Sequence, residues 1–115
     1  MAYDEYLGER IAQVLVDRKA DFRTIKMMGG LCFMVNDKMC VGIIKDMLMC
    51  RIGPDGYADA LAMDNVQEMG SSVRPMKGYV FVEADGFDMD DDLQYWIDRC
   101  LTYNPMANAS KKRKK

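Results

Sequence analysis

Four cysteines are the residues of this chain best suited to covalent or metal chemistry, but their spacing favours a structural role. Cys32, Cys40, Cys50 and Cys100 lie in apolar segments and form no Cys-x-x-Cys pair. Paired spacing is typical of zinc and redox sites, whereas isolated cysteines in apolar segments are usually reduced core residues. We therefore expect buried, reduced thiols, with Cys40 as the one thiol that would be reactive if it were exposed.

Histidine is absent from the sequence, which removes several kinds of active site. Zinc sites with imidazole ligands, histidine general bases and Ser–His or Cys–His pairs are all excluded. Gly29 and Gly30 open a predicted strand and lack the Lys-Ser/Thr of a phosphate-binding loop. The sequence therefore predicts a protein that is not an enzyme and has no catalytic residue, metal site or cofactor.

An acidic cluster at residues 88–92 could bind a cation or begin a helix. An EF-hand loop needs a closing glutamate at its twelfth position, and counted from Asp88 that position is Arg99. Carboxylates also complement the positive end of a helix dipole. We therefore interpret the cluster as the start of a helix.

Methionine is abundant in and beside the predicted strands. It could supply soft metal ligands, an adaptable binding surface or core packing, and we favour core packing. The residues are Met27, Met28, Met34, Met39, Met47 and Met49.

Residues 26–51 predict an antiparallel meander of three strands. Asn36 and Asp37 suit a two-residue hairpin loop because both tolerate positive φ, and a second turn falls at Lys45 and Asp46. The first loop pairs Val35 with Lys38, Phe33 with Cys40, and Cys32 with Val41. The second turn, less certain by one residue, pairs Ile43 with Leu48.

This pairing gives the sheet one uncharged face, which we expect to be the core. Its residues are Cys32, Met34, Met39, Val41, Ile43, Leu48, Cys50 and Ile52. The opposite face is mixed and too apolar to be fully wetted: Leu31, Phe33, Val35, Lys38, Cys40, Gly42, Ile44, Met47, Met49 and Arg51. A helix or the last strand of the same chain would cover it, or a partner would.

Basic residues in or beside the strands could form a small site for an anion or an acidic peptide. Arg51, Arg74 and Lys77 would have to converge for this. The candidate partner-binding residues are therefore Phe33, Met49, Arg51, Arg74 and Lys77.

The remaining segments predict three helices and a second strand region. Apolar residues recur at helical spacing in residues 3–19 and 93–101, and a short helix is expected over residues 55–63. Residues 79–83 read as a strand, with a short strand near residues 72–74. We expect residues 21–25 and 65–75 to be connections. One domain would span residues 1–105, followed by a flexible tail at residues 106–115.

The formal net charge is −2, yet the tail alone carries five positive charges, which leaves the body at −7. An acidic body argues against a broad nucleic-acid-binding face. The tail residues that could touch phosphate or an acidic partner are Lys111, Lys112, Arg113, Lys114 and Lys115. No apolar run is long enough for a membrane span, so a cytoplasmic protein without membrane contact is expected.

Four motifs together resemble the N-terminal domain of the TfoX/Sxy family. They are KMMGGLCFM at residues 26–34, KMCVG at 38–42, RIGP at 51–54 and PMKGYV at 75–80. The resemblance spans residues 6–103 and implies an α+β fold of α-β(3)-α-β(2)-α order, an antiparallel sheet with helices packed on it, similar to secretion-chaperone folds. Two-domain family members regulate DNA-uptake competence with a cyclic-AMP-responsive transcription factor. This chain resembles the short, single-domain members, for which no catalytic residue or cofactor is implied.

The sequence thus favours a non-catalytic protein-interaction or regulatory module with a protein partner, linked by resemblance to transcription or competence. A homodimer through the outer face is possible. The alternative is an accessory protein for a small ligand or nucleic acid, which would use the basic tail with Arg51, Arg74 and Lys77.

Overall fold

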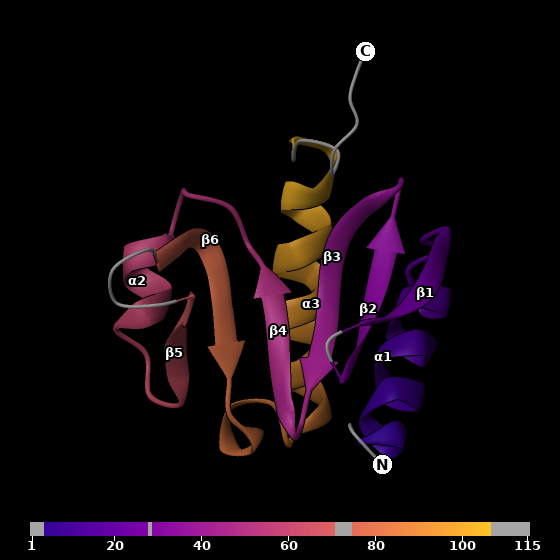
Figure 1. The fold of residues 1–115 in the computed structure, drawn as a ribbon, viewed down its shortest axis with the longest axis horizontal. Coiled ribbons are helices and arrows are strands. Elements are labelled where there is room, and N and C mark those ends of the chain that lie inside the picture. The colour runs from indigo at the N-terminus through magenta and orange to yellow at the C-terminus, as the bar shows by residue number, and fades with distance from the viewer. Residues whose placement is uncertain (1–3, 28, 71–74, 107–115) are drawn as a thin grey trace.

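The computed structural model describes residues 4–27, 29–70 and 75–106 and confirms the α+β class (Figure 1). All strands belong to one antiparallel sheet of order β1-β2-β3-β4-β6-β5. The strands are β1 (Phe22–Met27), β2 (Gly30–Val35), β3 (Lys38–Ile44), β4 (Met47–Arg51), β5 (Val66–Gly70) and β6 (Pro75–Val82). The helices are α1 (Glu5–Asp17), α2 (Tyr57–Leu61) and α3 (Asp90–Tyr103), with short 3₁₀ turns at Ala84–Gly86 and Asn104–Met106.

The three predicted helices are present, and acidic residues favour the starts of α1 and α3. The Asp4 carboxylate accepts a hydrogen bond from the Leu7 amide (3.2 Å) at the start of α1. The acidic cluster supplies the first turn of α3, and Asp90 there forms an ion pair with Arg10 of α1 at 3.0 Å. The interpretation of this cluster as a helix start is confirmed.

Both predicted turns of the meander are also present. Asn36 and Asp37 have φ of 56° and 61°, as a two-residue hairpin loop with a primed turn requires. Ile43 pairs with Leu48 across the second turn, as expected. Local turn chemistry therefore fixed the positions of both loops.

Two segments expected to be connections are strands. Residues 22–27 form β1, which pairs with β2 along its whole length, and residues 66–70 form β5 beside β6. The element order is consequently α-β(4)-α-β(2)-α, one strand more than expected in the first run. Polar residues interrupt both strands because each lies at an edge of the sheet, where fewer neighbours bury its side chains.

The register between β2 and β3 differs from the prediction by one residue. Met34 pairs with Met39, but Phe33 pairs with Val41, so Cys40 is an extra residue in β3. Such a β-bulge shifts the alternation of one strand relative to its neighbour. It places Phe33 and Val35 on the same face as Val41, and moves a second group to the opposite face: Cys32, Met34 and Met39.

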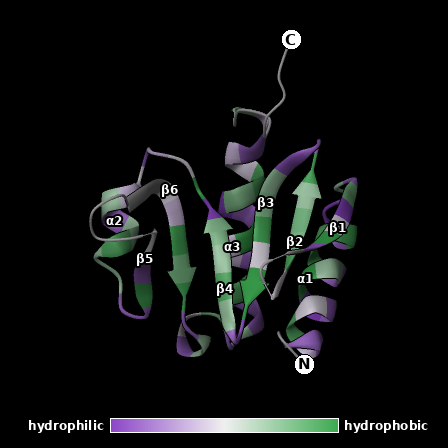
Figure 2. Cartoon of the chain, viewed as in Figure 1, coloured by the Kyte–Doolittle hydropathy of each residue, from purple (hydrophilic) through white to green (hydrophobic). Residues whose placement is uncertain are grey.

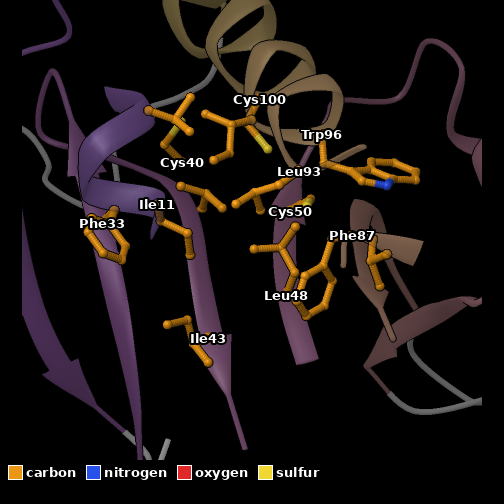
Figure 3. Close-up of a cluster of buried hydrophobic side chains, with 14 of the residues drawn as sticks. Ile11, Phe33, Cys40, Ile43, Leu48, Cys50, Phe87, Leu93, Trp96 and Cys100 are labelled. Carbon is orange, nitrogen blue, oxygen red and sulfur yellow. The ribbon is translucent and has the colours of Figure 1, made fainter. Parts of the chain in front are cut away.

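The core lies between the sheet and the helices. α1 and α3 both lie behind the sheet in Figure 1, and Arg18 of α1 pairs with Asp98 of α3 at 2.8 Å. Figure 3 shows side chains of α1, α3 and the strands meeting in this layer. The short helix α2 packs against β5 and β6, and its Ala60 belongs to the same cluster. The expected core position of Val41, Ile43, Leu48, Cys50 and Ile52 is confirmed.

The bulge makes Phe33 a core residue, with 1% of its surface exposed. We expect Phe33→Ala to lower the free energy of unfolding by about 3–5 kcal/mol, because the side chain leaves a cavity under α1. Met47→Ala, on the other face of the sheet, should cost about 1 kcal/mol. Urea denaturation measures both, and equal costs would contradict the bulged register.

Candidate functional site: the helix-free face of the sheet

The face of the sheet opposite the core carries no helix of the described chain, and we call it the helix-free face. Figure 2 views the sheet from this side, and residues of both faces together are mostly apolar or neutral along β2, β3, β4 and β6. Register places the following residues on it: Arg23, Ile25, Cys32, Met34, Met39, Gly42, Ile44, Met47, Met49, Arg51, Gln67, Tyr79 and Phe81.

The centre of the helix-free face is closely packed. The Cys32 thiol donates to the Met34 thioether with a sulfur–sulfur distance of 3.7 Å. The Met49 methyl group lies over Gly42 of the neighbouring strand, where a Cβ would stand only 2.6 Å from it. Around this closed centre, Met39, Ile44, Met47, Tyr79 and Phe81 are half-buried. The face is therefore an apolar surface with a filled centre.

Arg51 stands at one end of this face, at the last position of β4. Its guanidinium carbon lies 5.3 Å from the ring centroid of Tyr79 and 6.0 Å from that of Tyr103 in the last turn of α3. It also donates to the Met39 carbonyl oxygen at 3.4 Å. Cation–π contacts hold a guanidinium in place while it keeps its charge.

The contact between Arg51 and the Tyr103 ring depends on Gly53. This glycine has φ of +87°, and a Cβ there would collide with the Tyr103 ring. Asn104, which follows Tyr103, is buried, and its side-chain amide donates a hydrogen bond to the Val35 carbonyl oxygen at 3.0 Å. Close backbone approach and this hydrogen bond together fix the end of α3 against the sheet.

The candidate partner-binding residues are divided by the structure. Met49 and Arg51 lie on the helix-free face as expected, but Phe33 lies in the core because of the bulge at Cys40. Lys77 is part of β6, but its side chain lies outside what the structure describes, and so does all of Arg74. The five basic residues of the tail also fall outside the described residues.

Sequence reasoning missed Arg23 on this face, because residues 21–25 were expected to be a connection. Arg23 pairs with Met34 in register, and its guanidinium lies 3.4 Å from the Asp37 carboxylate. The signal was present in the sequence: Phe22 and Thr24 alternate with Arg23 and Ile25, as in a strand.

The thiols do not form a reactive site. All four cysteines are free and buried, as the sequence predicted. Cys40, expected on the outer face, instead lies on the core side beside Cys50 and Cys100 (Figure 3). A hydrogen bond with Cys100 and burial both raise the pKa of the Cys40 thiol, and burial raises the pKa of Cys100. Burial, with a smaller contribution from Cys40, raises the pKa of Cys32 to about 11.

A hollow of about 680 Å³ lies on the helix side, between the loop after β4 and the outer side of α3. Two of its charged groups are engaged within the protein: Arg99 donates to the Tyr95 hydroxyl and the Gly56 carbonyl, and Asp98 pairs with Arg18. Its rim therefore stabilises the contact between α3 and the loop.

Neither a metal cluster nor a membrane helix is found in the part of the chain that the structure describes. No three cysteine or carboxylate side chains are grouped as metal ligands there. None of the described helices combines the length and the apolar character needed to cross a bilayer.

Fold and face define a small α+β domain in which helices cover one side of the sheet, and the other side is apolar with none of the described helices over it. The chain belongs to the TfoX N-terminal domain family, whose family model matches residues 15–103. The match runs from the last three residues of α1 to the last residue of α3, so it includes every strand of the sheet. No curated protein and no solved structure matches the chain significantly.

We expect the native thiols to be unreactive near neutral pH. At pH 8 a thiol with a pKa of about 11 is deprotonated about 100-fold less than an ordinary cysteine, and burial further slows attack. Iodoacetamide labelling followed by mass spectrometry should therefore modify the folded protein far more slowly than the urea-unfolded protein. Because burial raises the pKa of the Cys32 thiol to about 11 in the folded state, the thiol's contribution to stability should be lost as pH rises above the ordinary cysteine pKa of about 9. Rapid labelling of folded Cys40 at pH 8 would contradict this account.

Gly53 offers a test of the support behind Arg51. Gly53→Ala should lower the free energy of unfolding by about 2–4 kcal/mol, because it combines strain at positive φ with displacement of a packed ring. Gly56→Ala is the matched control: Gly56 also has positive φ (+80°), but its nearest obstacle is the terminal guanidinium of the long Arg99 side chain and not a packed ring. Its cost should be about 1–2 kcal/mol. Thermal unfolding compares the two variants. A smaller loss of stability in Gly53→Ala than in Gly56→Ala would refute the proposed role of the Tyr103 contact.

Proposed function

We propose that this domain is a non-catalytic protein-interaction module, which binds protein through the helix-free face and serves a regulatory role linked to transcription. The observation that carries the proposal is the apolar character of a sheet face without a helix over it. In antiparallel sheets with one solvated face, apolar residues that point to the core normally alternate along each strand with polar residues that point to the solvent. Here the outward positions of β2, β3 and β4 are instead occupied mainly by methionine, cysteine and isoleucine.

Methionine supports binding to another protein in particular. Its unbranched, polarisable side chain adapts to irregular partners, and methionine-rich surfaces are typical of protein-binding sites. A nucleic-acid surface would instead need many Lys and Arg residues to neutralise phosphates. Among the described side chains of the helix-free face, only Arg23 and Arg51 are charged. The chemistry of the face therefore favours protein over nucleic acid.

The regulatory part of the proposal rests on the family. The chain belongs to the TfoX N-terminal domain family, and family resemblance links such domains to regulators of DNA-uptake competence that act with a transcription factor. The absence of histidine from the sequence supports a role in binding over one in acid–base catalysis.

The test is a pull-down: the domain is immobilised, cytosol of its source cells is passed over it, and the captured proteins are identified. Untagged copies of the chain itself are included among the captured proteins. Met47→Asp places a charge on the helix-free face and should reduce capture at least about 10-fold, because the carboxylate must be desolvated on binding. Val16→Asp is the control, since Val16 is an apolar residue of α1 that is 58% exposed. It should leave capture unchanged, and circular dichroism should confirm that both variants fold.

Two results would contradict the proposal. Undiminished capture by Met47→Asp would show that the helix-free face is not the binding surface. Recovery of nucleic acid in place of protein, with loss at raised salt, would favour the accessory role. Recovery of a transcription complex that Met47→Asp abolishes would support the regulatory role.

A further inference from the structure

Sulfur-containing side chains gather at the centre of the helix-free face. Cys32 and Met34 of β2 both point to this face, and their sulfur atoms are 3.7 Å apart. Met39 of β3 pairs with Met34, and Met49 of β4 lies in the same row as Cys32, because both pair with Gly42 between them. One thiol and three thioethers from three neighbouring strands therefore occupy adjacent positions. We call these four residues, Cys32, Met34, Met39 and Met49, the sulfur cluster.

Gly42 is the reason that Met49 reaches the sulfur cluster. A Cβ on this glycine would stand 2.6 Å from the Met49 methyl group and 3.4 Å from the Cys32 Cα atom. The Met49 methyl group therefore fills the space over β3 that a side chain would otherwise take, and its side chain is directed from β4 toward β2. The Met49 sulfur, which is bonded to that methyl group, is thereby brought toward Cys32.

The separation of the Cys32 and Met34 sulfur atoms fits ligation of a single metal ion. Two sulfur ligands that each lie about 2.3 Å from a tetrahedral metal are about 3.8 Å apart. The observed sulfur–sulfur distance of 3.7 Å is close to this value. The same distance suits a thiol–thioether hydrogen bond, and it is the two further thioethers beside the pair that distinguish a metal site from a simple contact.

The types of ligand in the sulfur cluster select a soft cation. Thiolates and thioethers favour Cu(I), whereas Mg²⁺, Ca²⁺ and Mn²⁺ prefer carboxylate, carbonyl and water oxygens. No carboxylate occurs within the sequences of β1, β2, β3, β4 or β6. Zinc is bound in proteins by cysteine, histidine and carboxylate ligands, and this cluster supplies only one of these. Its chemistry therefore matches Cu(I) better than the divalent ions.

Charge balance favours the same ion. The three buried members of the sulfur cluster are at most 8% exposed, and a charge without a counter-ion is costly in such a place. When Cu(I) binds, the S–H bond of Cys32 breaks, an S–Cu bond forms and the proton passes to the solvent. One thiolate and one Cu(I) ion carry no net charge together. The neutral complex also adds no positive charge beside Arg23 and Arg51, which lie in the row of Met34 and Met39.

We propose that the sulfur cluster is a binding site for Cu(I), with the Cys32 thiolate and the thioethers of Met34, Met39 and Met49 as ligands. It differs from the cysteine and carboxylate clusters that the described part of the chain lacks, because three of its four ligands are methionines. Met39 is half-buried, so it is the ligand that solvent reaches and the point where an ion enters. The inference goes beyond the proposed function and does not depend on it.

Titration of the whole chain under anaerobic, reducing conditions tests the site, with Cu(I) supplied as its bicinchoninate complex. The wild-type chain should withdraw one Cu(I) ion per molecule from this chelator. Cys32→Ala should lower the affinity at least about 100-fold, because it removes the one anionic ligand. Met34→Leu and Met49→Leu should each lower it about 10-fold, since leucine is close to methionine in volume but has no sulfur.

Two control variants separate this site from the other sulfur atoms of the chain. Met63→Leu removes a methionine that follows α2 and is 42% exposed, and it should leave the affinity unchanged. Cys100→Ala removes a thiol that lies in the core beside Cys40 and Cys50 (Figure 3), and it should also leave the affinity unchanged. Circular dichroism must show that each variant is folded.

Methionine methyl resonances locate the bound ion without any substitution. In a chain labelled with ¹³C-methyl methionine, one equivalent of Cu(I) should shift the methyl signals of Met34, Met39 and Met49 and leave that of Met63 in place. Cu(I) should also raise the melting temperature, because a ligand that binds only the folded state stabilises it.

Four results would overturn the inference. The chelator could keep its Cu(I) in the presence of the wild-type chain, or Cys32→Ala and Met49→Leu could bind as tightly as wild type. Loss of binding in Cys100→Ala would place the ion among the core thiols. A lower melting temperature with Cu(I) would show that the ion binds thiols of the unfolded chain. None of these results touches the proposed function, because capture of protein on the helix-free face is measured without copper.

Discussion

One extra residue, Cys40, decides which side chains of the sheet reach the core. Without it, a regular hairpin from Asn36 and Asp37 would direct Phe33 away from Val41 and bring Cys32 into the helix layer. With it, Phe33 and Val35 join Val41 and Ile43 beneath the helices. The burial of one aromatic ring favours this register by several kcal/mol, whereas a bulge leaves only one residue outside the ladder. The composition of the helix-free face is therefore a consequence of where the largest apolar side chain of β2, that of Phe33, is buried.

The same bulge explains how a cysteine and methionine face is left without a helix over it. Phe33, Val35, Val41 and Ile43 fill the helix side of β2 and β3, together with the bulged Cys40, whereas Cys32, Met34 and Met39 lie on the other side. There they bury one another: Cys32 contacts Met34, and Met49 lies over Gly42. Their mutual packing lowers the unfavourable free energy of exposing an apolar face to water. Part of that free energy remains, because the surrounding methionine, isoleucine and aromatic side chains are only half-buried. Association with protein would bury that remainder.

Local signals in the sequence predicted much of this structure. The helices, the loop at Asn36 and Asp37, the turn at Lys45 and the core role of Leu48 follow from periodicity and turn chemistry, and all are confirmed. β1 and β5 were missed because edge strands carry polar residues that resemble connections. The bulge was missed because adjacent apolar residues at Phe33 and Met34 give no preference for either face, so only tertiary packing selects the register. Arg51 was identified, but its contact with Tyr103 depends on a helix end that lies 52 residues further along the chain.

The bulged register can be observed directly in solution by ¹³C-edited nuclear Overhauser spectroscopy of the Phe33 ring. The account predicts contacts from this ring to Phe22, whose ring centroid lies 5.7 Å away, and to Ala12 of α1, which lines the same groove. It predicts none to the Met49 methyl group on the opposite face. Strong contacts between Phe33 and Met49, with none to α1, would show the regular register and contradict the assignment of the helix-free face.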